Sequence, residues 1–319
     1  MTVSKTGFYT HEDCRKHEMG PGHPECPERL DAIQDRLLVS GVSDALEHLE
    51  APLASLNDIE LAHDRLHVAA LRGLTLRLVE EQAAGGPEHT SLDSDTSINA
   101  HTWTAALRAA GAAMAATDAV LAGELENAFC MVRPPGHHAT RSKAMGFCFF
   151  NNVAVAAKYA LQRHNLQRVA VIDFDVHHGN GTEDILAGDE RALMCSFFQH
   201  PFYPYSGDQN PAPNMCNVPV PAYSKGMDIR EVVEMMWIPR LEEFQPEMMF
   251  ISAGFDAHRE DDMGQLGLTE QDFSWITQRL KDVARRYCNG RIVSCLEGGY
   301  IPSALARSVE AHLRVLADV

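Results

Sequence analysis

The sequence lacks a CxxC pair, an apolar run of the roughly twenty residues that would cross a bilayer, and an apolar N-terminal stretch typical of a signal peptide. Its eight cysteines stand apart, and three of them lie in apolar runs, namely Cys130, Cys195 and Cys295. This spacing argues against a zinc knuckle or a disulfide framework and predicts reduced core residues. We therefore expect a cytoplasmic protein with no membrane partner.

Basic residues are scarce as well. The chain has 27 Lys and Arg residues against 44 Asp and Glu residues, and its formal net charge is −17. Sequence-independent binding to DNA or RNA needs clustered basic side chains, so no nucleic-acid partner is expected. The acidic balance is compatible with cationic substrates.

Strand-like apolar runs alternate with helical patterns along the chain. The runs lie at residues 128–139, 146–152, 168–182, 192–198, 246–258 and 291–300. Helices are expected from residue 28 onward, at 63–84, at about 101–121, and after residues 152, 269 and 301. The alternation predicts a three-layer α/β/α fold, in which a central, mostly parallel multi-stranded sheet is covered on both faces.

Two segments are predicted to be irregular. Residues 1–30 end in a stretch rich in proline and glycine, which predicts an ordered loop rather than a strand or helix. Residues 200–225 contain six prolines and predict a functional loop. A domain linker is the alternative at 200–225, but the composition does not change across it, so we expect a single domain at 1–319.

A candidate metal site follows the apolar run Val169–Ile172, where the sequence continues DFDVHHGNGT. Alternate residues of an extended strand share a face, so Asp173, Asp175 and His177 can project to one side. A solvated strand end is the alternative, but the Gly-Asn-Gly that follows allows the backbone to turn tightly near a ligand. The pattern favours a metal site.

Other strand-like runs also end in polar groups: His137 and His138, Asp256, and the stretch from Glu297 to Tyr300. Parallel sheets of this kind bind ligands at the carboxyl ends of their strands. Asp175, His177 and Asp256 would offer two oxygens and one nitrogen, as a catalytic zinc site does. Non-haem iron sites have the opposite ratio, which makes oxygenase chemistry less favoured.

The tandem His137 and His138 follow a rigid Pro-Pro-Gly turn, which favours general acid-base roles over a purely structural one. Asp173 and Asn180 are natural partners to orient the two rings. Tyr300, after two glycines, could donate its hydroxyl to a developing oxyanion. A buried aromatic residue after a turn is an equally good interpretation of Tyr300 taken alone.

These residues carry a family resemblance. The motifs RPPGHHA, GFCFFNN, DFDVHHGNG, SAGFDAH and LEGGY, together with HPECPERL near the start, resemble those of the zinc-dependent deacetylases of the arginase/deacetylase fold. The chain looks most like class II histone deacetylases, bacterial histone-deacetylase-like amidohydrolases and acetylpolyamine amidohydrolases. The resemblance covers roughly residues 7–312.

The resemblance implies a role for each matched residue. Zinc would be bound by Asp175, His177 and Asp256. His138 would be the general base and then the acid, with His137 as its electrostatic partner, and Tyr300 would hold the substrate carbonyl. A structural potassium ion would be bound, partly through backbone carbonyls, by Asp173, Asp175, His177, Ser196 and Phe197. Asn180 replaces the aspartate of class I relatives, and His178 has no assigned role beyond packing.

Binuclear manganese ureohydrolases share this fold. Their second metal needs carboxylates at the positions of Gly179 and Gly254 here. Glycine offers no side-chain ligand, so one metal ion is expected.

The resemblance also implies a substrate tunnel. Phe147, after Gly146, and Tyr203 would form opposite walls around an acyl-lysine stem, although both could be plain core residues. Asp95 would accept a backbone N–H of the substrate at the rim. Met263 occupies the place of a glutamate that selects for polyamines, which favours acyl-lysine, but the acidic residues just before it keep acetylpolyamines open.

We therefore expect a zinc-dependent amidohydrolase that removes acetyl or other short acyl groups from an acylated lysine or another small acylated amine. The alternatives are an acetylpolyamine deacetylase and a catalytically silent acyl-lysine-binding protein. Homo-oligomerisation is left open.

Overall fold

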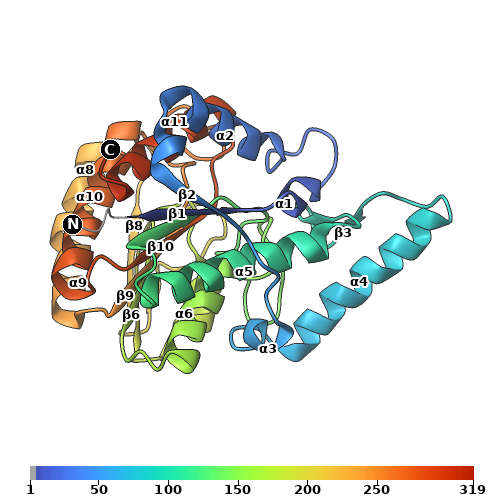
Figure 1. The fold of residues 1–319 in the computed structure, drawn as a ribbon, viewed down its shortest axis with the longest axis horizontal. Coiled ribbons are helices and arrows are strands. Elements are labelled where there is room, and N and C mark those ends of the chain that lie inside the picture. The colour runs from blue at the N-terminus through green and yellow to red at the C-terminus, as the bar shows by residue number, and fades with distance from the viewer. Residues whose placement is uncertain (1–4) are drawn as a thin grey trace.

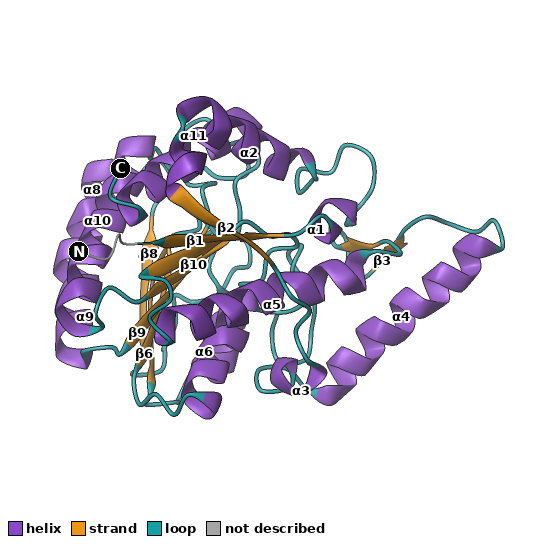
Figure 2. Ribbon diagram, in the orientation of Figure 1, coloured by secondary structure: helices purple, strands orange, loops and turns teal. Residues whose placement is uncertain are grey.

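The computed structural model describes residues 5–319 and contains a central parallel sheet of eight strands (Figures 1 and 2). Its spatial order is β2-β1-β5-β10-β9-β6-β7-β8, and every neighbouring pair is parallel. The strands are β1 (Thr6–Thr10), β2 (Leu46–Glu50), β5 (Asn127–Cys130), β6 (Val169–Asp173), β7 (Ala192–Gln199), β8 (Met215–Val220), β9 (Met248–Ala253) and β10 (Ile292–Leu296). A separate antiparallel pair joins β3 (Thr90–Ser91) and β4 (Ser97–Ile98).

Helices cover both faces of the sheet, which confirms the predicted three-layer α/β/α fold (Figure 2). The helices α5 and α6 pack on one face, while α2, α10 and α11 pack together on the other (Figure 1). The helices are α1 (Asp13–Lys16), α2 (Glu28–Ser40), α3 (Leu56–Ile59), α4 (Arg65–Ala83), α5 (Thr102–Leu121), α6 (Asn152–Arg163), α7 (Asn180–Leu186), α8 (Gly226–Val232), α9 (Ile238–Phe244), α10 (Glu270–Tyr287) and α11 (Pro302–Leu316). Short turns of other helix types span Val42–Ala45 and Val233–Trp237.

Helix starts follow local sequence signals. Asn151 caps α6, because its side-chain oxygen accepts a hydrogen bond from the N–H of Ala154 at 2.9 Å. Thr269 and Asp272 form the predicted capping box at the start of α10. Pro302 occupies the first turn of α11, as predicted.

The prediction that residues 1–30 form a loop was wrong within the described residues, since they contain β1 and α1; residues 1–4 lie outside the described part. Gly7 lies in β1, where an added Cβ would come 2.5 Å from Leu125 Cδ1. Gly7 therefore allows close packing of β1 at this point.

Two other expectations also need correction. Residues 146–152 do not form a strand, because Gly146 and Phe147 adopt positive φ values of 55° and 68°. The proline-rich segment 200–225 contains β8, which lies at the edge of the sheet. Pro219 is tolerated there, since an edge strand needs ladder hydrogen bonds on one side only.

The cysteines Cys130, Cys195 and Cys295 are buried free thiols in the sheet, as predicted. Within residues 5–319, no helix is both long and apolar enough to cross a membrane.

Candidate active site

The carboxyl ends of four adjacent strands, β5, β10, β9 and β6, bring the predicted polar groups to one edge of the sheet. The turn after β5 carries His137 and His138, the turn after β6 carries Asp175 and His177, and the turn after β9 carries Asp256. All five residues are at most 7% exposed. Residues far apart in the sequence therefore form one buried polar cluster.

The candidate metal site consists of Asp175, His177 and Asp256, whose ligand atoms all lie within 4.8 Å of one another. His177 Nδ1 lies 3.0 Å from Asp175 Oδ1 and 3.2 Å from Asp256 Oδ2. Burial lowers the pKa of His177, but hydrogen bonds to the two carboxylates outweigh it and raise that pKa to about 10. The two buried carboxylates thus make this point favourable for a positive charge. Two carboxylate oxygens and one imidazole nitrogen form a donor set that fits a zinc ion.

The backbone around this site leaves no room for further side chains. An added Cβ at Gly254 would come 2.0 Å from Asp175 Oδ2, and one at Gly179 would come 2.3 Å from Asp173 Oδ2. The N–H of Gly298 donates to Asp175 Oδ2 at 2.9 Å. The positions where a second metal would need carboxylates are therefore closed by close packing.

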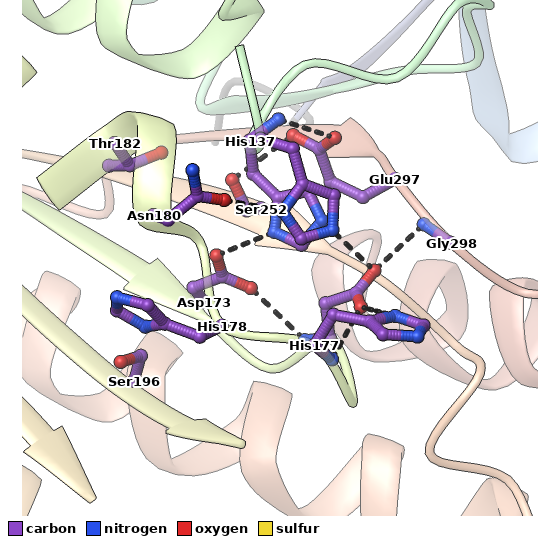
Figure 3. Close-up of polar contacts among 12 residues, drawn as sticks. His137, Asp173, His177, His178, Asn180, Thr182, Ser196, Ser252, Glu297 and Gly298 are labelled. Carbon is purple, nitrogen blue, oxygen red and sulfur yellow. Dashed lines mark hydrogen bonds and ion pairs between the residues drawn. The ribbon is translucent and has the colours of Figure 1, made fainter. Parts of the chain in front are cut away.

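The two adjacent histidines have different partners. His137 Nδ1 lies 3.0 Å from Asp173 Oδ2 (Figure 3), whereas His138 Nδ1 lies 2.7 Å from Asn180 Oδ1. Burial opposes a charge on His137, but Asp175 and Asp173 outweigh it and raise the pKa of that ring well above its usual range. Burial, followed by His137 and His177, lowers the pKa of His138. One ring is thus favoured as the cation and its neighbour as the neutral base.

Glu297 is a site residue for which the sequence suggested no role. Its Oε2 accepts the backbone N–H groups of Gly136 at 2.6 Å and His137 at 3.1 Å, and Ser252 Oγ donates to its Oε1 at 3.1 Å (Figure 3). Burial raises its pKa to about 7. Glu297 therefore fixes the turn that carries both histidines. The sequence feature that could have indicated this role is a carboxylate directly after the buried run Ile292–Leu296.

A buried ion-pair network of Arg29, Glu25 and Arg133 contacts the loop and the ring of Tyr300. Arg29 donates to the carbonyl oxygens of Gly299 at 2.6 Å and Glu297 at 2.5 Å, and its guanidinium lies 5.1 Å from the centre of the Tyr300 ring. Glu25 accepts from Arg29 at 3.0 Å and also binds Arg133; all three charged residues have no exposed surface. The HPECPERL motif thus holds the loop that carries Tyr300, through Arg29. The sequence did not reveal this role.

A pocket of ≈ 240 Å³ opens above this cluster. It brings together every residue predicted for substrate binding with several site residues, and its lining is Asp95, His138, Gly146, Phe147, His177, Phe202, Tyr203, Asp262, Met263 and Tyr300. The Tyr203 ring lies edge-on to His138 with centroids 5.2 Å apart, and Phe147 lies edge-on to Tyr300 at 5.9 Å. Phe202 was not predicted, whereas Asp262 belongs to the acidic residues just before Met263 that kept acetylpolyamines open.

The residues predicted for potassium lie in β6, in the turn after it and in the neighbouring strand β7. Asp173 and Ser196 are register partners in β6 and β7, and Phe197 follows Ser196. Asp173 Oδ1 accepts the N–H of Asp175 at 3.1 Å. The three residues therefore lie where backbone and side-chain oxygens of two strands meet.

His178 supports the loop that carries Tyr203. Its Nε2 lies 2.6 Å from Glu183 Oε2, which also accepts from Asn217 at 3.1 Å. Asn217 in turn donates to the carbonyl oxygen of Gly207 at 3.2 Å. The residue without an assigned role thus links α7 to the 200–213 loop.

Comparisons with known proteins agree with this geometry. Residues 23–316 match the family model described as the histone deacetylase domain. The chain is 38% identical over 307 residues to a probable deacetylase of Archaeoglobus fulgidus, covering 92% of this chain and 81% of that protein. It is 36% identical over 321 residues to a histone deacetylase-like amidohydrolase of Pseudomonas aeruginosa, covering 93% and 82%. The crystal structure of the HDA15 HD domain matches with a TM-score of 0.90 and 32% identity, covering 99% of this chain and 90% of that one.

Proposed function

The chain belongs to the histone deacetylase family, and we propose that it is a zinc-dependent amidohydrolase that removes acetyl or another short acyl group from an acylated amine, with Nε-acyl-lysine as the leading substrate class. The observation that carries this proposal is the buried Asp175, His177 and Asp256 cluster, which lies beside two histidines at the base of an aromatic-walled pocket. When bound there, zinc supplies a Lewis acid for the amide carbonyl and lowers the pKa of water.

The proton transfers are assigned to His138. Its Nδ1 is held by Asn180, so Nε2 is the nitrogen that can accept a proton from the attacking water and return it to the leaving amine. His137, charged through Asp173 and Asp175, would stabilise the negative charge that develops nearby. The Tyr300 hydroxyl would donate to the carbonyl oxygen, since its side chain lines the pocket.

The pocket walls support a linear, apolar substrate stem. Phe147 and Tyr203 would sandwich the methylene chain, while Gly146 leaves space next to His138. Asp95 is exposed at the mouth and would accept an N–H of the substrate backbone. We propose in addition that Asp173, Asp175, His177, Ser196 and Phe197 hold a structural potassium ion.

Acetylpolyamines are the second candidate substrates. Asp262 and Asp95 are both exposed carboxylates that line the pocket, and they would attract an additional ammonium group. Met263, which is neutral, lines the same pocket and favours the acyl-lysine assignment.

The test is turnover by purified protein on an acetyl-lysine peptide and on acetylspermidine at matched concentrations. We expect the higher kcat/KM on the peptide, and a Tyr300→Phe variant should lower kcat about 100- to 1,000-fold with an unchanged Tm. A higher kcat/KM on acetylspermidine would show that acetylpolyamines, rather than acyl-lysine, are the preferred substrate class. Absence of hydrolysis of either compound by the wild-type protein would contradict both substrate assignments and favour the silent acyl-lysine-binding alternative, and full activity of Tyr300→Phe would refute the assigned mechanism.

A further inference from the structure

Asp261 is a buried carboxylate that joins the pocket rim to the backbone of Tyr300. Its Oδ2 accepts the N–H of Tyr300 at 2.6 Å and the N–H of Ile301 at 3.3 Å. Its Oδ1 accepts the N–H of Met263 at 3.0 Å. The residue is 6% exposed, so these three hydrogen bonds lie largely away from water. One side chain therefore connects the loop after β9 to the loop after β10.

The backbone that carries Tyr300 needs such an anchor. Gly298 and Gly299 come directly before it, and Gly299 adopts a positive φ of 119°. Glycine has the widest conformational freedom of all residues, so the preceding backbone does not by itself fix the direction of the tyrosine. Arg29 donates to the carbonyl oxygen of Gly299 at 2.6 Å and so holds one side of the peptide group between Gly299 and Tyr300. Asp261 holds the other side of that peptide group, the N–H of Tyr300, while Arg29 and Phe147 contact the ring.

The position of Tyr300 matters because its hydroxyl must meet the carbonyl oxygen as negative charge develops there. Hydrogen-bond donors contribute to catalysis only when they are held close to the position of that oxygen, and a displacement of about 1 Å can lower the rate by about 100-fold. A change in backbone angle at Gly299 would displace the hydroxyl, because the long tyrosine side chain amplifies that change.

We propose that Asp261 is a positioning residue for deacylation, which fixes the Tyr300 backbone and ties it to the rim at Met263. This inference rests on the proposed function, but it concerns a side chain to which the reaction itself assigns no part. Asp261 acts through Tyr300 and does not touch the reacting atoms.

The test compares Asp261→Ala, Asp261→Asn and the control Glu260→Gln. Alanine removes all three hydrogen bonds, so kcat on an acetyl-lysine peptide should fall about 10- to 100-fold while KM changes less than about threefold. An amide can turn its oxygen toward the N–H groups of Tyr300 and Ile301, so Asp261→Asn should recover kcat to within about fivefold of the wild type. Glu260 binds the surface side chain of Arg307, and its amide variant should behave as the wild type.

A double-mutant cycle with Tyr300→Phe separates positioning from general stability. If Asp261 acts through the tyrosine hydroxyl, adding Asp261→Ala to Tyr300→Phe should lower kcat less than about twofold further. Equal, multiplicative losses in both backgrounds would overturn the inference, as would wild-type kcat in Asp261→Ala. If the alanine variant does not fold, Asp261→Ser takes its place in the cycle.

Crystal structures of the wild-type and Asp261→Ala proteins make the test independent of turnover. We expect Tyr300 to move or to adopt several conformations in the variant, and an unmoved tyrosine would refute the inference. Lack of zinc-dependent hydrolysis by the wild type would instead defeat the proposed function alone.

Discussion

The Nδ1 atom of His138 lies 2.7 Å from the side-chain amide oxygen of Asn180. The amide nitrogen of Asn180 points the other way, toward Met145 Sδ at 3.5 Å, so its oxygen is the atom that faces the ring. An amide oxygen can only accept a hydrogen bond, which places the proton of the neutral ring on Nδ1. The Nε2 lone pair of His138 is therefore free to act as a base.

Replacing Asn180 by aspartate should shift the pH dependence of catalysis. A carboxylate next to Nδ1 stabilises the charged ring and raises the pKa of His138. Because the base must be neutral to accept a proton, the acid limb of the kcat/KM profile should move to higher pH. Profiles of the wild type, Asn180→Asp and the surface control Asn57→Asp would show this; an acid limb that stays in place in Asn180→Asp would contradict the role of His138.

Replacing Gly254 by alanine should disrupt the metal site. The new methyl group would lie 2.0 Å from Asp175 Oδ2, so the Asp175 carboxylate must leave the position in which it meets His177 and Asp256. We expect lower zinc content and lower turnover in Gly254→Ala. The matched control is Gly73→Ala in α4, where an added Cβ meets nothing within 4 Å and helix propensity should raise stability by about 0.5–1 kcal/mol. Normal zinc content in Gly254→Ala would show that the site is not as tightly packed as described.

His312 should make the folded state sensitive to acid. Burial lowers its pKa to about 3, and its two ring nitrogens lie 2.7 Å from Thr277 Oγ1 and 3.0 Å from Ser294 Oγ. The folded-state pKa is below the unfolded value of about 6.5, so this stability is present above pH ~6.5 and is lost as the pH falls toward ~3.

The measurement is the free energy of unfolding at pH 7 and pH 5 for the wild type, His312→Gln and the exposed control His101→Gln. The loss between these pH values should be smaller by about 2 kcal/mol in His312→Gln than in the wild type, whatever its stability at pH 7. The control should keep the wild-type loss. Equal losses in the wild type and His312→Gln would show that His312 is not held neutral in the folded protein.

The side chains around the metal site could be predicted because they depend on short-range rules. The end of a buried apolar run located Asp173, Asp175 and His177 together, although the strand ends at Asp173 and the other two lie in the turn after it. Parallel topology then brings Asp256 and the histidine pair to the same edge of the sheet. These steps need only residue type and strand direction.

The supporting residues could not be predicted, because they act through partners that a sequence does not display. Glu297 and Asp261 bind backbone N–H groups of distant loops, and any residue could supply those groups. Arg29 and Glu25 are charged and would be expected at the surface, yet they are fully buried against each other. Phe147 was predicted within a strand-like run, but its positive φ belongs to the turn that places it in the pocket wall.

The central claim is that Asp175, His177 and Asp256 hold a zinc ion that the reaction requires. The most direct measurement is the zinc content of the purified protein, together with its turnover on an acetyl-lysine peptide before chelation, after chelation and after zinc is added back. The account predicts one zinc ion per chain, loss of activity on chelation, recovery with zinc, and neither zinc nor activity in Asp256→Asn. Hydrolysis that persists in the chelated protein, or in zinc-free Asp256→Asn, would contradict it.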